Sequence, residues 1–462
     1  MKAHDGIYLD GAWRPAAGQD VIEVVNPVDE QVVDRVPAGG AEDVDAAVRA
    51  ARAALPAWAA TPPAERAARL AALRDVLVAR KDEIAETITA ELGSPLPFSQ
   101  AVHAGAPIAV AGSYAELAAT HPFEEKVGNS TVYQEPIGVV GAITPWNYPL
   151  HQIVAKVAPA LAAGCTVVLK PAENTPLSAQ LFAEAVHEAG VPAGVFNLVT
   201  GLGTVAGQAL VEHPGVDLVS FTGSTAVGRR IAATAGAAIK KVALELGGKS
   251  ANVILPSADL ARAVNVGVAN VMSNSGQTCS AWTRMLVHRD QYDEAVALAA
   301  AAAAKYGDRI GPVVSARQQE RVRGYIEKGV AEGARLVAGG PDAPRERGWF
   351  VSPTVFADVT PDMTIAQEEI FGPVLSVLRY EDEDDALRIA NGTVYGLAGA
   401  VWAGDEAEAV AFARRMDTGQ VDINGGRFNP LAPFGGYKQS GVGRELGAHG
   451  LTEYLQTKSL QF

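Results

Sequence analysis

A cysteine within a short polar loop is the residue of this sequence best suited to nucleophilic chemistry. Cys279 lies in residues 273–280 (SNSGQTCS) and is one of only two cysteines in 462 residues. Apolar spacing predicts a helix over residues 259–272 and a strand over 285–287. A thiol at such a junction can be exposed, and a nearby backbone N–H can stabilise the oxyanion formed when the thiol attacks a carbonyl. A lone cysteine can equally be a small buried hydrophobe, so the loop alone leaves both interpretations open.

Two other polar side chains suit the remaining steps of such a reaction. Glu245 directly follows the apolar stretch 242–244, and a carboxylate among apolar neighbours has the raised pKa that a general base needs near neutral pH. Asn147 lies between prolines in residues 145–149 (PWNYP), where its uncharged amide can donate to an oxyanion. The alternative for Asn147 is an asparagine that only forms a turn.

The chain around these residues predicts a parallel sheet. Between residues 137 and 244, strand patterns alternate with helix patterns over short loops, which is typical of a sheet covered by helices on both faces. Ligands of such sheets bind at the carboxyl ends of the strands. The loops in those positions are 144–147, 170–173, 200–203, 222–224 and 245–248.

Two of these loops contain groups that suit a dinucleotide. Ser224 precedes a helix whose first N–H groups could bind a pyrophosphate, although Ser224 could instead only cap the helix. Glu173 could accept hydrogen bonds from a ribose and repel a 2′-phosphate, or it could form a loop ion pair with Lys170. Residues 201–207 miss the G-x-G-x-x-G pattern by one residue, so no single motif identifies the cofactor.

The rest of the chain predicts further α/β structure around this sheet. We expect short N-terminal strands, three helices up to residue 119, a hairpin over 121–135, a second α/β layer after residue 249, and a C-terminal strand. The expected strands are 6–9, 21–25, 166–169, 195–199, 218–221, 241–244, 251–255, 334–337, 352–357, 374–380 and 452–462, and the expected helices are 42–58, 64–92, 99–119, 150–161, 176–188, 205–212, 225–235, 292–305 and 316–332.

Composition excludes several classes of function. With 48% hydrophobic and 19% charged residues, the chain reads as an ordinary folded protein of two or three domains. A net charge of -14 without a basic block argues against nucleic acid as a partner. The first ten residues lack an apolar signal core, and the longest apolar run, 295–304, is half of a membrane span, so we expect a cytoplasmic protein without a membrane partner. No cysteine and histidine spacing suits a metal site.

The combined motifs are far more specific than any one of them. They occur in one order along the chain: PWNYP at 145–149, LKPAENTP at 169–176, FTGS at 221–224, LELGGKS at 244–250, SGQTCSA at 275–281, EEIFGPV at 368–374 and PFGGYKQSGVGRE at 433–445. In this the chain closely resembles the aldehyde dehydrogenase superfamily, and specifically its hydrolytic NAD(P)-dependent members.

The resemblance implies a role for each matching residue. Cys279 would attack the aldehyde, Asn147 would bind the oxyanion with the Cys279 N–H, and Glu245 would activate the water that hydrolyses the thioester. It implies NAD as cofactor, with NADP possible, at Ile143, Thr144, Pro145, Trp146, Lys170, Ala172, Glu173, Gly203, Phe221, Thr222, Gly223, Ser224, Val227, Leu246, Gly247, Glu369 and Phe371. By position, the substrate tunnel would be lined by Tyr148, His151, Gln152, Thr278, Ser280, Phe428 and Phe434.

The resemblance also implies an architecture and an assembly. We expect a Rossmann-like NAD-binding domain (1–120 and 137–247), an α/β catalytic domain (248–446) and a small β oligomerisation domain (121–136 and 447–462), in a homodimer or homotetramer. Two departures stand out: the loop 305–312 is short, and Trp282 is unusually bulky so close to the cysteine.

The substrate and three rival activities remain open at this point. The aromatic lining suits a medium-sized aliphatic or aromatic aldehyde, whereas Arg427 could read a distal carboxylate and admit semialdehydes. A coenzyme A-acylating dehydrogenase usually lacks the glutamate base and is disfavoured by Glu245. A cofactor-independent cysteine esterase and a non-catalytic binding protein are the other two rivals.

Overall fold

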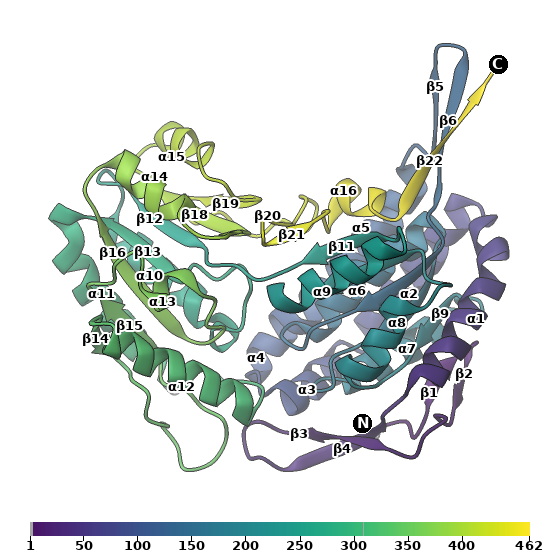
Figure 1. The fold of residues 1–462 in the computed structure, drawn as a ribbon, viewed down its shortest axis with the longest axis horizontal. Helices are drawn as coiled ribbons and strands as arrows, with labels where there is room; N and C mark the ends of the chain where they lie inside the picture. The colour runs from purple at the N-terminus through teal and green to yellow at the C-terminus, as the bar shows by residue number, and fades with distance from the viewer. Residues whose placement is uncertain (1–2, 308) are drawn as a thin grey trace.

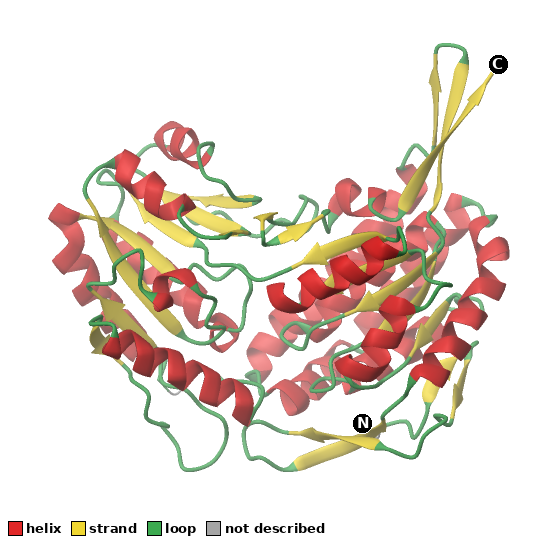
Figure 2. Cartoon of the chain, viewed as in Figure 1, coloured by secondary structure: helices red, strands yellow, loops and turns green. Residues whose placement is uncertain are grey.

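The chain folds into two α/β parts that lie side by side and a narrow β-sheet that projects from one of them (Figure 1). The computed structural model describes residues 3–307 and 309–462; Asp308, in the short loop 305–312, and residues 1–2 of the N-terminal stretch lie outside the described residues. Each α/β part has its own sheet with helices packed on its faces (Figure 2).

The first sheet has a parallel centre with antiparallel strands at both edges. Its spatial order is β2 (Ala12–Arg14), β1 (Ile7–Leu9), β9 (Phe196–Leu198), β8 (Thr166–Lys170), β7 (Val139–Ile143), β10 (Leu218–Thr222), β11 (Lys241–Glu245) and β21 (Gly441–Val442). The strands β9, β8, β7, β10 and β11 are parallel, as the strand–helix alternation predicts.

Alternating side chains explain why helices cover both faces of this sheet. In β7, Val140 and Ala142 contribute to one apolar core, whereas Val139 and Ile143 contribute to the core on the opposite face. The helical segments of this part are α1 (Ala41–Ala59), α2 (Pro63–Ala79), α3 (Lys81–Leu92), α4 (Leu96–Phe98), η1 (Ser99–Ala104), α5 (Gly105–Thr120), α6 (Pro149–Ala163), α7 (Leu177–Glu188), η2 (Gly203–Gly207), α8 (Gln208–Glu212), α9 (Thr225–Ala237) and α16 (Gly447–Thr452).

The second sheet is also parallel except at one edge. Its order is β14 (Arg335–Ala338), β15 (Thr354–Ala357), β16 (Val374–Tyr380), β13 (Arg284–His288), β12 (Ala251–Ile254), β18 (Ala398–Trp402) and β19 (Gln420–Ile423), with β14 antiparallel. Its helical segments are α10 (Leu260–Met272), η3 (Ser273–Gly276), η4 (Arg289–Gln291), α11 (Tyr292–Ala304), α12 (Ala316–Ala331), α13 (Thr364–Gln367), α14 (Glu383–Asn391) and α15 (Glu406–Ala413).

Three smaller sheets complete the chain. Strands β3 (Val21–Val25) and β4 (Val32–Pro37) form one pair, and β17 (Tyr395–Gly396) and β20 (Tyr437–Lys438) form another. The expected hairpin is β5 (Glu124–Val127) and β6 (Ser130–Pro136), and the C-terminal strand β22 (Leu455–Gln461) pairs with β6 over seven residues. This three-stranded sheet projects away from both α/β parts (Figure 1).

The structure corrects the sequence prediction in three places. The single helix expected over 64–92 is two helices that meet at Arg80, and the helix expected from Ser99 begins as a π-helix, η1. The helix expected over 205–212 likewise begins with a π-helix, η2. The glycine-rich tail after Gly435 contains a short strand, β21, which joins the first sheet beside β11.

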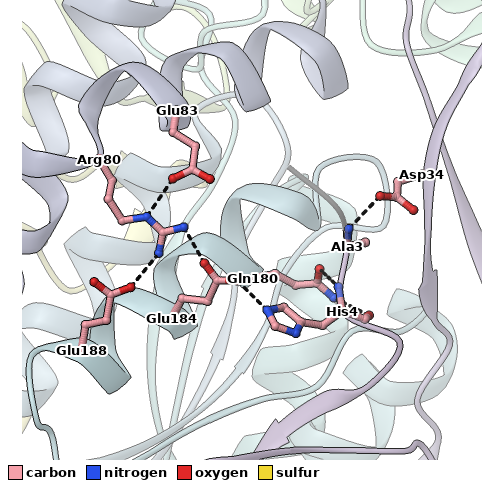
Figure 3. Close-up of polar contacts among 8 residues, drawn as sticks. All are labelled: Ala3, His4, Asp34, Arg80, Glu83, Gln180, Glu184 and Glu188. Carbon is pink, nitrogen blue, oxygen red and sulfur yellow. Dashed lines mark hydrogen bonds and ion pairs between the residues drawn. The ribbon is translucent and has the colours of Figure 1, made fainter.

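Arg80 lies at the break between α2 and α3 and forms three ion pairs there. Its guanidinium donates to Glu83 at 2.8 Å, to Glu184 at 2.5 Å and to Glu188 at 3.1 Å, so it connects α3 to α7 (Figure 3). Glu184 also lies 2.5 Å from His4 Nε2, which extends the network to the N-terminal segment.

None of the helices in the described part of the chain is both long and apolar enough to cross a membrane.

We predict that Arg80→Ala lowers the free energy of unfolding by about 1–2 kcal/mol, because three carboxylates lose their shared cation at a half-buried site. Urea unfolding followed by circular dichroism measures this change. The matched control is Arg74→Ala, whose exposed pair with neighbouring Asp75 contributes little. Equal effects of the two substitutions would contradict a structural role for the Arg80 network.

Candidate active site

Parallel strands of the first sheet bring the predicted site residues to one edge. Ile143 at the end of β7 is paired with Lys170 at the end of β8, and Thr222 at the end of β10 is paired with Glu245 at the end of β11. Four loops therefore leave the sheet at the same edge, which faces the cysteine loop of the second part. A ligand bound there would contact both α/β parts.

The cysteine loop has an unusual backbone. Asn274, Ser275 and Gly276 all have positive φ angles, of 50°, 56° and 74°. Gly276 is required for space as well, because a Cβ there would lie 2.0 Å from the Gly372 carbonyl oxygen. Side-chain bonds hold the loop: Ser275 donates to the Gly311 carbonyl at 2.7 Å, and Gln277 Oε1 accepts from the Val314 N–H at 2.9 Å.

The cysteine opens onto a cavity of about 530 Å³ between the two α/β parts, which we call the central cavity. It is lined by Pro145, Trp146, Asn147, Glu173, Asn174, Thr222, Gly223, Ser224, Leu246, Gly247, Cys279, Val314, Ser315, Arg317, Gln318, Arg321, Glu369 and Phe371. Twelve of these were predicted as site residues. Cys165, by contrast, is completely buried and donates to the Tyr454 carbonyl.

The surroundings of Cys279 favour the neutral thiol. Burial raises its pKa first, and the carboxylates of Glu369, Glu245 and Glu445 raise it further. The isolated protein therefore holds Cys279 mainly as a thiol at neutral pH.

Asn147 is positioned as an amide donor beside the cysteine loop. Its Nδ2 donates to the Gln277 carbonyl at 3.0 Å, and its backbone carbonyl accepts from Asn274 Nδ2 at 2.8 Å. An amide nitrogen has two hydrogens, so one remains for an oxyanion in the central cavity. The buried position of Asn147 fixes this donor before any substrate binds.

Glu245 lies in a buried cluster of charges that sequence reasoning missed. Lys156 on α6 forms an ion pair with Glu445 Oε1 and donates to Thr222 Oγ1 at 2.7 Å. Burial and the Glu445 carboxylate raise the pKa of Glu245 well above its usual range, while Lys156 and Arg444 oppose the shift. Glu245 Oε2 accepts no hydrogen bond from any residue that the structure describes.

The sequence could have indicated that Lys156 is a buried charge, because it is the single lysine, arginine or acidic residue in α6, a helix composed mostly of apolar residues. No comparable pattern marks Glu445 as a buried charge, since it ends the glycine-rich motif at 433–445. The tail reaches Glu245 through Gly435, where a Cβ would lie 2.7 Å from Glu245 Oε1.

The start of α9 offers donors to the central cavity. Ser224 caps the helix by accepting from the Val227 N–H at 3.4 Å, and the preceding Gly223 leaves the backbone open. A Cβ at Gly223 would lie 2.5 Å from the Phe221 ring, so this close backbone approach requires glycine. A helix start facing a cavity favours a negatively charged group such as a phosphate.

Opposite α9, helix α12 holds the segment that contains Glu369 and Phe371. Gln318 Nε2 donates to the Phe371 carbonyl at 2.8 Å, and Arg321 donates to the Glu369 carbonyl at 2.7 Å. The Glu369 carboxylate accepts from the Gly248 N–H at 3.1 Å, and burial raises its pKa to about 7. The ring of Phe371 packs edge-on against Trp146 at 5.3 Å.

Glu173 forms the ion pair that the sequence left open, and its role at a ribose stays a prediction. Lys170 donates to Glu173 Oε2 at 3.2 Å, so the ion pair exists. The Glu173 carboxylate is nevertheless half exposed and lines the central cavity, where it remains able to accept further hydrogen bonds.

Some of the predicted cofactor residues do not line the central cavity. The residues that do not line it are Ile143, Thr144, Lys170, Ala172, Gly203, Phe221 and Val227. All except Gly203 and Val227 are buried, and Gly203 lies close to Lys170, whose Nζ would be 3.9 Å from a Cβ there. The lining residues of α12, with Val314 and Ser315, were not predicted, because they are distant in sequence from every recognised motif; Asn174 was also not predicted, although it lies within the motif at 169–176.

Several of the predicted substrate residues contact one another. Tyr148 and Thr278 share a hydrogen bond of 2.8 Å between their hydroxyl groups. The Phe428 ring lies 6.4 Å from His151 and 6.5 Å from Phe434. Among the described residues, His151 Nδ1 and Gln152 Oε1 are buried without a hydrogen-bond partner.

A second pocket, which we call the side pocket, lies next to this cluster. It encloses about 330 Å³ and is lined by Val266, Ala269, Asn270, Ser273, Ser280, Trp282, Gln420, Asp422, Gly425, Gly426 and Phe428. Trp282 is buried and points into this wall, which settles its orientation. Arg427 is exposed and is not among the residues lining either pocket.

Comparison with known proteins adds to this geometry. The chain matches the model of the aldehyde dehydrogenase family over residues 13–460. It is 47% identical over 471 aligned residues to a 3-succinoylsemialdehyde-pyridine dehydrogenase from a Pseudomonas species, covering 100% of this chain and 99% of that protein.

Solved structures agree with the sequence comparison. A cysteine-to-alanine variant of aldehyde dehydrogenase C from Pseudomonas syringae, complexed with NAD+ and octanal, superposes with a TM-score of 0.98 at 46% identity, covering 99% of this chain and 96% of that chain. An aldehyde dehydrogenase from Mycobacterium tuberculosis complexed with NAD+ gives 0.97 at 45% identity, covering 100% and 98%. The fold class predicted from the sequence is confirmed.

We predict that iodoacetamide labels Cys279 and not the buried Cys165, and that the rate rises about tenfold per pH unit from pH 7 to 9. The reason is that the raised pKa of the thiol keeps the thiolate scarce, and its fraction grows with pH. Peptide mass spectrometry over time measures both effects. A Cys279→Ala control should stay unlabelled, and a rate already constant below pH 8 would contradict the raised pKa.

Proposed function

The chain belongs to the aldehyde dehydrogenase family, and from this premise we propose that it oxidises an aldehyde to the carboxylic acid with NAD as the hydride acceptor. The single observation that carries the proposal is the position of Cys279 in the wall of the central cavity together with Asn147, with Glu245, which does not itself line the cavity, close enough for its carboxylate to raise the pKa of the Cys279 thiol. A nucleophile, an oxyanion donor and a general base in one site are what hydrolytic aldehyde oxidation requires.

The cavity fits a nicotinamide dinucleotide. The open backbone at Gly223 and the start of α9 suit the pyrophosphate, the Glu173 carboxylate suits the adenosine ribose, and Glu369 suits the second ribose. When bound, the oxidised nicotinamide supplies an acceptor for hydride. Glu173 favours NAD, because its charge would repel the 2′-phosphate of NADP. NADP is the alternative cofactor.

In the first half of the reaction, the Cys279 sulfur bonds to the aldehyde carbon. The thiol proton leaves to water, and the carbonyl π electrons move to the oxygen, which the Asn147 amide and the Cys279 N–H stabilise. Re-formation of the carbonyl then expels hydride from the same carbon and leaves a thioester on Cys279.

In the second half, water attacks the thioester carbon while Glu245 takes its proton. The C–S bond breaks, the carboxylic acid leaves and the thiol is restored. The free Oε2 of Glu245 suits this task, since it has an unused lone pair and no described partner to compete with water. Glu245 then returns this proton to the Cys279 sulfur, so both hydrogens of the water are accounted for in the acid and the thiol. The same glutamate argues against acyl transfer to coenzyme A.

The aromatic side chains near Cys279 support a medium-sized aliphatic or aromatic aldehyde as substrate. A semialdehyde is the second candidate, because a relative with 47% identity is called a semialdehyde dehydrogenase. Arg427, the residue that could bind its carboxylate, is exposed rather than in either pocket, so the structure favours this candidate less.

We further propose a cytoplasmic enzyme that assembles as a homodimer or homotetramer. The projecting sheet supports the assembly, because its outer strand β5 is exposed along its length and offers an unpaired edge. The domain division expected from the sequence remains part of this proposal.

We expect purified protein to reduce NAD when aldehydes of graded length are supplied without coenzyme A. Absorbance at 340 nm measures the product, and Cys279→Ala should remove the activity while Cys165→Ala retains it. The preference for NAD over NADP should be at least about tenfold in kcat/KM. Reduction of NAD that survives Cys279→Ala would contradict the proposed nucleophile.

We expect Glu245→Gln to keep a rapid first burst of NADH and to slow the steady state by about 100-fold or more, because only thioester hydrolysis needs the base. Stopped-flow absorbance separates the two phases. Since the pKa of Glu245 is raised, wild-type steady-state turnover should increase with pH beyond the ordinary glutamate range, and the variant should lose this increase. A slowed burst with an unchanged steady state would contradict the assignment.

A further inference from the structure

The side pocket contains an uncompensated carboxylate beside the nucleophile, and nothing in the proposed reaction uses it. Asp422 on β19 and Ser280, which directly follows Cys279 in the chain, both line this pocket. The pocket thus adjoins the cysteine loop and is a place into which the far end of an aldehyde bound to Cys279 could extend. This inference rests on the proposed function and concerns its substrate.

The alternation of β19 explains why Asp422 faces the pocket. Val421 and Ile423 point the other way and pack against the apolar core of the second sheet. Gln420 and Asp422 therefore share the opposite face, where both line the side pocket. A helical stripe of α10, which includes Ala269 and Asn270, forms the facing wall.

The charge of Asp422 has no cation to balance it. The carboxylate accepts a hydrogen bond of 3.3 Å from Gln420 Nε2, and burial raises its pKa. Within residues 3–307 and 309–462, no lysine, arginine or histidine forms an ion pair with it. The nearest basic side chain on the α10 stripe, Arg262, instead lies over the Trp402 ring at 5.7 Å.

Two aromatic rings complete the pocket. Trp282 forms part of its wall, and Phe428, which is 49% exposed, lies at the surface where the pocket meets the cluster of His151. Aromatic faces attract cations and do not attract anions. A pocket lined by a carboxylate and by two aromatic side chains therefore favours a positively charged group and disfavours a negatively charged one.

We propose that the side pocket receives the far end of the substrate and selects aldehydes whose far end has a positive charge, such as a quaternary ammonium or a protonated amine. Asp422 supplies the charge, and Trp282 and Phe428 supply the aromatic surfaces. Aldehydes that end in a carboxylate are disfavoured at the same position.

The test uses isosteric substrates that differ only in charge. Aldehydes of four, six and eight carbons with a terminal trimethylammonium group are compared with analogues in which carbon replaces the nitrogen, and with semialdehydes of similar length. At the best chain length we expect kcat/KM for the cation to exceed that of its neutral analogue by about tenfold. The semialdehydes should be the poorest substrates.

Asp422→Asn should bring the ratio of cationic to neutral kcat/KM close to one. The matched control is Asp417→Asn, which removes one charge from the exposed surface near the same strand and should keep the wild-type ratio. A ratio near one in the wild type, or one unchanged by Asp422→Asn, would overturn the inference while leaving the dehydrogenase intact. Failure to oxidise any aldehyde would instead overturn the proposed function.

Discussion

The buried ammonium of Lys156 is the constraint on which much of the site depends. A lysine inside an apolar helix is costly to bury unless a partner of opposite charge and further hydrogen bonds compensate it. Glu445 and Thr222 provide both, and they come from the C-terminal tail and from β10. One charge on α6 thereby connects three segments that are far apart in the sequence.

The position of Glu245 follows from this arrangement. The tail that brings Glu445 inward also places β21 next to β11, with Gly441 opposite Glu245. Glu245 then lies beside an ion pair rather than beside an isolated charge, so Glu445 raises its pKa while Lys156 limits the shift. The same carboxylates keep Cys279 protonated in the isolated protein, so one cluster influences both the nucleophile and the base.

The sequence predicted the parallel sheet, because strand and helix patterns are local, and the same patterns mark candidate residues at the strand ends, whose roles stay predictions. Apolar strands, short loops and polar residues after strands identify Asn147, Glu173 and Glu245 without long-range information. The contacts made by α12 and by Glu445 depend on packing between distant segments, which no local pattern encodes. The pairing of Arg80 with Glu184 and Glu188 could not be predicted for the same reason, since both partners are about a hundred residues away.

Backbone strain links the nucleophile to the opposite wall of the central cavity. Asn274 and Ser275 in the cysteine loop and Phe371 across from it are non-glycine residues with positive φ angles, each of which costs about 1–3 kcal/mol. The two loops touch where Gly276 packs on Gly372, and Gln318 holds the Phe371 carbonyl. Such strain persists only where surrounding bonds fix the backbone. These bonds therefore hold the cysteine loop and the Phe371 segment in place relative to each other. A cavity wall held in this way can orient an acceptor toward the carbon bonded to sulfur without rearrangement during the reaction.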